Sequence, residues 1–107
     1  MVRATTVKAV KVQYTVRPEF VETNKENIRR VMNALRADPI PGMHYATFQL
    51  ADEQTFVHIN MARDQVTMDR FSEVEAFGVF RQALKASQPV SPPASETLNL
   101  VAAGFEL

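Results

Sequence analysis

The chain has 107 residues, of which 46% are apolar and 22% charged, a composition typical of one globular domain over residues 1–107. Its twelve basic and twelve acidic residues cancel, so nucleic acid and acidic membrane surfaces are disfavoured as partners. The absence of cysteine excludes disulfides, thiolate metal sites and a cysteine nucleophile. The first six residues do not lead into a signal peptide and no apolar run reaches about 18 residues, so we expect a cytoplasmic protein.

The first half of the chain predicts a strand, a helix and a hairpin. Residues 8–17 alternate between apolar and polar types, which is the period of a half-buried strand. Pro18 suits a first helical turn, and apolar residues then recur at helical spacing, which predicts a helix over residues 19–37. Two further runs, 43–50 and 55–61, flank the polar tip 51–54 and predict a β-hairpin.

The hairpin also predicts its own register. If the tip forms the loop, Leu50 lies opposite Thr55 and successive pairs fall on alternate faces. One face then holds the pairs Phe48/Val57 and Ala46/Ile59, and the other holds Gln49/Phe56, Thr47/His58 and Tyr45/Asn60. We expect the first, more apolar set to face the helices.

The second half predicts one helix and a last strand. Residues 63–70 read as an irregular polar segment, and Ser72 to Glu75 has the form of a capping box, with Phe71 placed as its hydrophobic staple. The helix that starts there should end near residue 86. Three prolines within 88–95 predict a loop, and residues 96–107 predict the fourth strand.

The order β-α-β-β-α-β predicts a ferredoxin-like α+β fold: a four-stranded antiparallel sheet with both helices on one face and the first and third strands in the centre. The expected helix-side residues are Val10, Val12, Val16, Phe48, Val57, Ile59, Leu98 and Leu100. The expected opposite face holds Gln13, Thr15, Tyr45, Thr47, Phe56, His58, Asn60, Val101 and Ala103. That mixture is too apolar for open solvent and too polar for a dry core, so we expect a homodimer that encloses a partly polar cavity between two such faces.

The pattern of residues 8–14, 43–48, 55–60 and 71–77 resembles the dimeric α/β-barrel superfamily, and within it the antibiotic biosynthesis monooxygenase-like proteins. The resemblance implies dimers that pack sheet to sheet. Members of this superfamily include oxygenases that need no metal or organic cofactor, haem-degrading enzymes and stress-associated proteins, so the resemblance specifies no single reaction. This chain lacks the tryptophan typical of the family pocket and has no histidine in its second helix, which disfavours haem breakdown.

His58 is the candidate catalytic base, because its ordinary pKa allows proton exchange near neutrality. Asn60, with Thr47 or Tyr45, is placed to orient it or to stabilise a developing oxyanion. Gln13 and Asn60 are candidates for binding a ligand carbonyl. The candidates for stacking on an aromatic substrate are Tyr45 and Phe56. The competing interpretation, which such patterns more often favour, is a satisfied polar network and aromatic packing at a subunit interface.

Other residues support chemistry less well. His44 and His58 have no nearby carboxylate cluster, so no metal site is expected. Arg17, Arg63 and Arg70 lie near element ends, where they either rim the cavity as anion anchors or are simply solvated.

Three functions remain open from the sequence. The first is a cofactor-independent monooxygenase or isomerase acting on a small aromatic or enolisable molecule. The second is a non-catalytic ligand-binding or stress-associated dimer. The third is an RNA-binding module of the same element order, which the neutral charge and the missing basic-glycine-aromatic opening of the third strand disfavour.

Overall fold

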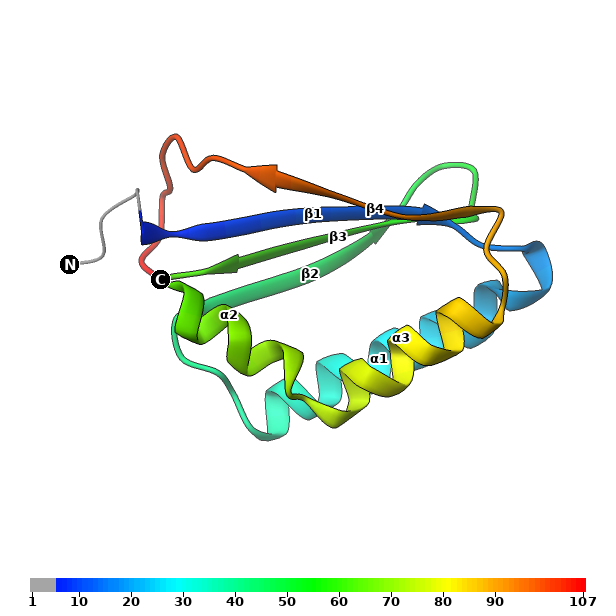
Figure 1. Ribbon diagram of the computed structural model, residues 1–107, viewed down its shortest axis with the longest axis horizontal. Coiled ribbons are helices and arrows are strands. Elements are labelled where there is room, and N and C mark those ends of the chain that lie inside the picture. Colours follow the sequence, from blue (N-terminus) through cyan, green and yellow to red (C-terminus); the bar gives the residue numbers. More distant parts are fainter. Residues whose placement is uncertain (1–5) are drawn as a thin grey trace.

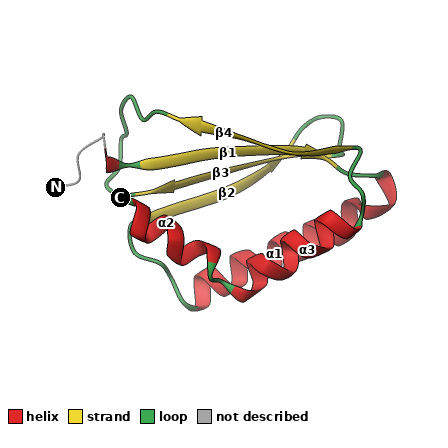
Figure 2. Ribbon diagram, in the orientation of Figure 1, coloured by secondary structure: helices red, strands yellow, loops and turns green. Residues whose placement is uncertain are grey.

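The computed structural model describes residues 6–107. The expectation that the chain does not begin with a signal peptide concerns residues 1–5 in part, and these lie outside the described residues. Along the chain the elements are β1 (Lys8–Thr15), η2 (Pro18–Phe20), α1 (Val21–Ala37), β2 (Met43–Gln49), β3 (Thr55–Ala62), α2 (Gln65–Ser72), α3 (Glu75–Ala86) and β4 (Ser91–Leu98). The four strands form one antiparallel sheet in the order β2-β3-β1-β4. All the helices lie on one side of it (Figures 1 and 2). The predicted ferredoxin-like fold, with its first and third strands in the centre, is confirmed.

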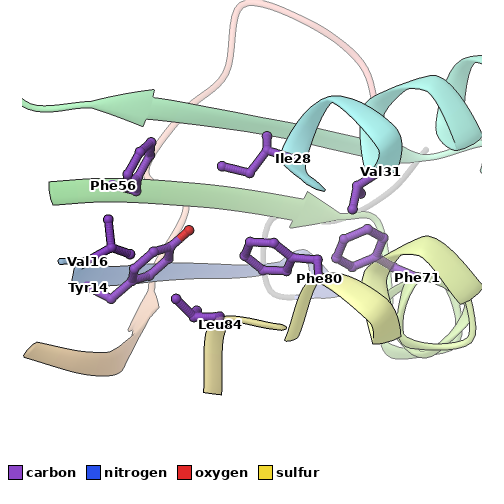
Figure 3. Packing of buried hydrophobic residues seen from close by; sticks show 8 residues of the cluster. All are labelled: Tyr14, Val16, Ile28, Val31, Phe56, Phe71, Phe80 and Leu84. Carbon is purple, nitrogen blue, oxygen red and sulfur yellow. The ribbon is translucent and has the colours of Figure 1, made fainter. Parts of the chain in front are cut away.

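The sheet has an inner face toward the helices and an outer face turned away from them. The inner face and the helices enclose a core of Tyr14, Val16, Ile28, Val31, Phe56, Phe71, Phe80 and Leu84 (Figure 3). Its aromatic rings come from the central strands and from α2 and α3. Within residues 6–107, no helix combines the length and the apolar character needed to cross a membrane.

The hairpin register is confirmed, with Thr47 opposite His58 and Tyr45 opposite Asn60. The assignment of its faces is wrong. His58 is only 4% exposed and lies on the inner face, whereas Phe48 is 59% exposed on the outer face. The pairing of the central strands β1 and β3 explains the orientation of His58. Val12 of β1 faces the helices and lies opposite His58, and cross-strand partners share a face.

The same inversion applies to the other residues of the two sets. Phe56 and Asn60 are buried on the inner face. Val57, Ile59 and Leu98 occupy the outer face, opposite Gln13, Lys11 and Ala9 of β1. Val10, Val12 and Val16 are on the inner side and Gln13 and Thr15 on the outer side, as predicted.

The last strand begins earlier than predicted. β4 contains Pro92 and Pro93, which the sequence placed in a loop, and it ends at Leu98. A proline lacks the N–H of a strand ladder and is therefore tolerated on an edge strand or beside a bulge; β4 is an edge, and its pairing with β1 shifts between Gln13 and Thr15. The sequence predicted that the strand continues over residues 99–107, but this segment contains no strand, and Val101 within it is 94% exposed.

The segment predicted to be irregular, residues 63–70, contains most of the helix α2. Asp64 caps the start of this helix, because its carboxylate accepts a hydrogen bond from the Thr67 backbone N–H at 2.8 Å. The predicted capping box is wrong, because Ser72 ends α2 and α3 starts at Glu75 with no side-chain cap. Phe71 is buried between Tyr45 and Phe77, with ring centroids 4.6 and 4.3 Å away. The first helix agrees with prediction, apart from the short turn η2 that precedes α1.

Candidate functional site

A cavity of about 610 Å³ lies between the inner face of the sheet and the helices α2 and α3. Its lining comprises Val10, Val12, Tyr14, Tyr45, His58, Asn60, Met68, Asp69, Phe71, Ser72, Phe77, Phe80, Arg81, Leu84, Lys85, Pro89, Pro92, Pro93 and Ser95. Most of these side chains are apolar or aromatic, and a few polar groups are contributed by the central strands. An apolar pocket with a small number of convergent polar groups is the usual form of a small-molecule site.

His58 is the centre of a hydrogen-bond network at the buried end of this cavity. Its Nε2 lies 2.8 Å from the hydroxyl of Tyr14, and its Nδ1 lies 2.6 Å from the hydroxyl of Tyr45 and 3.0 Å from that of Thr47. Asn24, which is fully buried on α1, donates its amide N–H to the Tyr14 hydroxyl at 2.9 Å. The network therefore connects α1 to three strands. It explains why a polar residue at position 58 can face the core, since buried polar groups are stable when hydrogen-bonded.

The groups of the network are uncharged near neutral pH. Burial lowers the pKa of His58 to about 4, so the imidazole is neutral. Burial raises the pKa of Tyr45 to about 12, against the opposing effect of a hydrogen bond from Thr47. It raises the pKa of Tyr14 as well, despite the hydrogen bond from Asn24. Both phenols therefore keep their protons.

The amide at one end of the network favours one direction of donation. The Nδ2 of Asn24 can only donate, so the Tyr14 oxygen accepts from it, and we assign the Tyr14 proton to the remaining partner, His58 Nε2. A neutral imidazole that accepts at Nε2 carries its proton on Nδ1, which donates to the hydroxyl oxygen of Tyr45. The proton of Tyr45 is then available to a molecule in the cavity.

Asn60 is the other polar group on the buried wall of the cavity. Its side-chain amide donates to the sulfur of Met68 at 3.2 Å, and its carbonyl oxygen is buried with no hydrogen-bond donor among the described residues. An unpaired buried acceptor is costly, typically by about 1–3 kcal/mol. A hydroxyl or N–H donor that reaches this oxygen would remove that cost.

The structure brings together four of the six predicted site residues. Tyr45, His58 and Asn60 line the cavity, and Thr47 contacts His58. Phe56 is buried in the core, where its ring stacks on Tyr14 at 5.7 Å, and it does not line the cavity. Gln13 lies on the outer face, in a shallow groove beside β4.

Sequence reasoning missed Tyr14, Asn24 and the charged pair Arg81 and Lys85. Asn24 had a readable signal, because it falls on the apolar stripe of α1 four residues after Phe20 and four before Ile28. None of the three arginines considered as anion anchors lines the cavity. His44 lies against the ring of Phe105 at 4.8 Å, away from His58, and no three metal-binding side chains lie together in residues 6–107.

No protein-family model matches the sequence, and no curated protein matches it. Solved structures do match. A protein from Mycobacterium tuberculosis superposes with a TM-score of 0.79 at 16% identity, over 94% of this chain and 100% of the other. A candidate antibiotic biosynthesis monooxygenase from Nitrosomonas europaea gives 0.76 at 17% identity, over 90% and 91% of the two chains.

A third match is a variant of SnoaB, a cofactor-independent oxygenase from Streptomyces nogalater, with a TM-score of 0.71 at 16% identity over 94% of this chain and 99% of the other. Identities this low establish architecture and leave activity open. The chain thus has the fold of the antibiotic biosynthesis monooxygenase-like proteins, as the resemblance in its sequence predicts.

Proposed function

We propose that this protein is a cofactor-independent monooxygenase that acts on a small aromatic or enolisable molecule bound between the sheet and the helices. The observation that carries the proposal is the neutral network of Tyr14, His58 and Tyr45 at the buried end of an aromatic-lined cavity. The structural likeness to a cofactor-independent oxygenase supports it.

In such a reaction the substrate supplies all the electrons. When a CH₂ group becomes a carbonyl, one atom of O₂ enters the product and the other leaves as water, so the substrate loses four electrons and O₂ gains four. The protein has to favour the substrate anion that reacts with oxygen, which fixed hydrogen-bond donors in an apolar site can do. With the His58 proton assigned to Nδ1, the Tyr45 oxygen accepts from His58 and the Tyr45 proton is left as the donor that this step requires.

His58 acts in this proposal through Tyr45. Its two ring nitrogens are both hydrogen-bonded, and a group whose pKa is about 4 is a weak base at neutral pH. We therefore assign His58 the task of orienting the Tyr45 hydroxyl. Without a strong base in the cavity, the favoured substrates are those that ionise readily by themselves, namely phenols and enolised ketones.

The alternative is a non-catalytic protein that binds the same class of molecule. The low pKa of His58 favours this alternative because it leaves no strong base in the cavity at neutral pH, and the lack of tryptophan favours it because the resembling oxygenases typically have one in the pocket. The two functions share the cavity and differ in whether the bound molecule is consumed.

We also propose that two copies pair through the outer face of the sheet. Phe48 and Leu50 are 59% and 41% exposed there, and Val57 and Ile59 are only half-buried. An apolar sheet face of this kind is unfavourable in water and is stabilised when a second copy covers it. Pairing in this way leaves the cavity, which lies on the other side of the sheet, within one chain.

The proposed activity is tested by oxygen uptake with a panel of phenols and enolisable ketones, with product analysis after incubation in ¹⁸O₂. We expect Tyr45→Phe and His58→Gln each to lower kcat/KM at least about tenfold, as removal of an oxyanion donor usually does. His44→Gln, which changes the exposed histidine, should leave the rate unchanged. If ligands bind and come back unaltered with no oxygen consumed, the non-catalytic alternative is correct.

A further inference from the structure

The cavity opens between α3, the end of α2 and the edge strand β4. The lining residues Tyr14, His58, Asn60, Phe71, Phe80 and Leu84 are buried and form its inner part. The solvent-exposed lining residues are Asp69, Ser72, Arg81, Lys85, Pro92, Pro93 and Ser95. A molecule in the cavity therefore has one end among neutral hydrogen-bonding groups and the other end at this opening.

Two cations lie at the opening. Arg81 and Lys85 are one helical turn apart on α3, and both line the cavity. The ion pairs of residues 6–107 involve Lys11, Lys25, Arg29 and Arg30, and neither of these two. Asp69, the acidic residue of the lining, already accepts a hydrogen bond from Gln65 at 2.8 Å.

The Arg81 guanidinium is held in place by an aromatic ring. Its central carbon lies 5.0 Å from the centroid of Phe77, which is itself part of the cavity wall. A guanidinium that stacks over a ring can still donate hydrogen bonds to a ligand, because its N–H groups lie in its own plane. Lys85, in the last turn of α3, is placed favourably toward the helix dipole, and this also leaves its three donors free.

A ligand carboxylate is less favourable at the buried end than at the opening, because the buried end offers hydrogen-bond donors and no cation. Tyr14 and Tyr45 keep their protons and His58 is neutral, so no cation would compensate a carboxylate there. Burying an unpaired carboxylate is strongly unfavourable, whereas at the opening solvent and two cations remain.

We infer that the cavity takes a flat aromatic molecule carrying an anionic group, with its rings against Phe71, Phe77 and Phe80 and its anion between Arg81 and Lys85. The inference names the ligand class and rests on the proposed function only in using the same cavity. Because the whole chain has a net charge of zero, a preference for anions has to come from this local pair.

The test compares 2-naphthoate with 2-naphthamide, a neutral molecule of nearly the same shape, by isothermal titration calorimetry at pH 7.5. We expect naphthoate to bind about tenfold more tightly at low ionic strength, with the advantage shrinking between about 0.02 and 0.3 M salt. The Arg81→Gln/Lys85→Gln variant should bind the two molecules equally. The matched control Arg29→Gln/Arg30→Gln, which removes two cations from α1, should keep the preference.

Equal binding of the two molecules by the unmodified protein overturns the inference, as does a preference that the control variant loses to the same extent. The salt titration tests the unmodified protein and so does not depend on either variant folding. Oxygen uptake separates this inference from the proposed function. Turnover of phenols without a preference for naphthoate refutes the ligand class alone, and the preference without any oxygen uptake refutes the enzyme alone.

Discussion

The buried histidine should make the stability of this protein depend on pH in a defined window. Burial lowers the pKa of His58 from an ordinary 6.5 to about 4 in the folded chain. Between these two values the unfolded chain binds the proton and the folded chain does not, so acid favours unfolding. The contribution of His58 is therefore complete above pH 6.5, and it is lost as the pH falls from 6.5 toward 4.

The size of the effect follows from the two pKa values. The difference between 6.5 and about 4, at about 1.4 kcal/mol for each pH unit, amounts to about 3 kcal/mol of unfolding free energy. For a domain of this size that is a large fraction of an expected stability of about 5–15 kcal/mol. Asp52 and Asp64, whose pKa values are lowered by hydrogen bonds to Thr55 and Thr67 respectively, act in the same direction only below their ordinary value of 3.8.

Urea denaturation at fixed protein concentration, from pH 7.5 to 4, measures this dependence directly. His58→Gln should flatten the pH profile between 6.5 and 4 by about 3 kcal/mol, while its stability at pH 7.5 falls because Tyr14 and Tyr45 lose a partner. His44→Gln is the matched control and should keep the profile of the unmodified protein. Profiles of equal slope for the protein and His58→Gln would refute the burial argument, as would an NMR titration that places the His58 pKa near 6.5.

Four further predictions concern individual residues. Gly42→Ala should destabilise the protein by more than about 1 kcal/mol in urea denaturation, because φ at Gly42 is +81° and a Cβ would lie 2.5 Å from the Arg63 side chain. Gly78→Ala should instead stabilise α3 by about 0.5–1 kcal/mol in the same assay, because a Cβ at Gly78 meets nothing within 4 Å. The ¹⁵N chemical shifts of His58 should show the proton on Nδ1, and a proton on Nε2 would contradict the order of donation from Asn24. Ile59→Asp should yield a folded monomer by light scattering and circular dichroism, and a variant that remains dimeric would exclude the outer face as the interface.

The pairing of strands was predictable because alternation and loop length determine register without reference to the rest of the fold. Thr47 therefore lies opposite His58, as predicted. The face was not predictable from the hairpin alone, since a strand of period two offers two complementary sets of side chains. The polar set with His58 faces the core because Tyr14, Tyr45 and Thr47 satisfy its ring nitrogens, and the Tyr14 contact comes from outside the hairpin, 44 positions away in sequence.

The two wrongly predicted elements have local causes. Proline was read as a loop signal over residues 88–95, yet β4 is an edge strand beside a register shift, where missing N–H groups cost little. In α2 only Thr67 and Phe71 are buried, and one of the two is polar, so the periodic signal is limited to one pair four residues apart. The Asp64 cap was the readable sign of its start.

Placing His58 beneath the helices separates two properties that the sequence had combined on one face. The ligand would then bind on the inner face and a second copy on the outer face, so the two kinds of binding would use different residues. In the proposed dimer the cavity and the partner lie on opposite sides of the sheet, and the network that joins His58 to Tyr45 lies within one chain. An outer-face substitution that dissociates the proposed dimer should therefore leave the affinity for a cavity ligand intact, whereas a chamber formed between two sheets would lose its ligand together with the dimer.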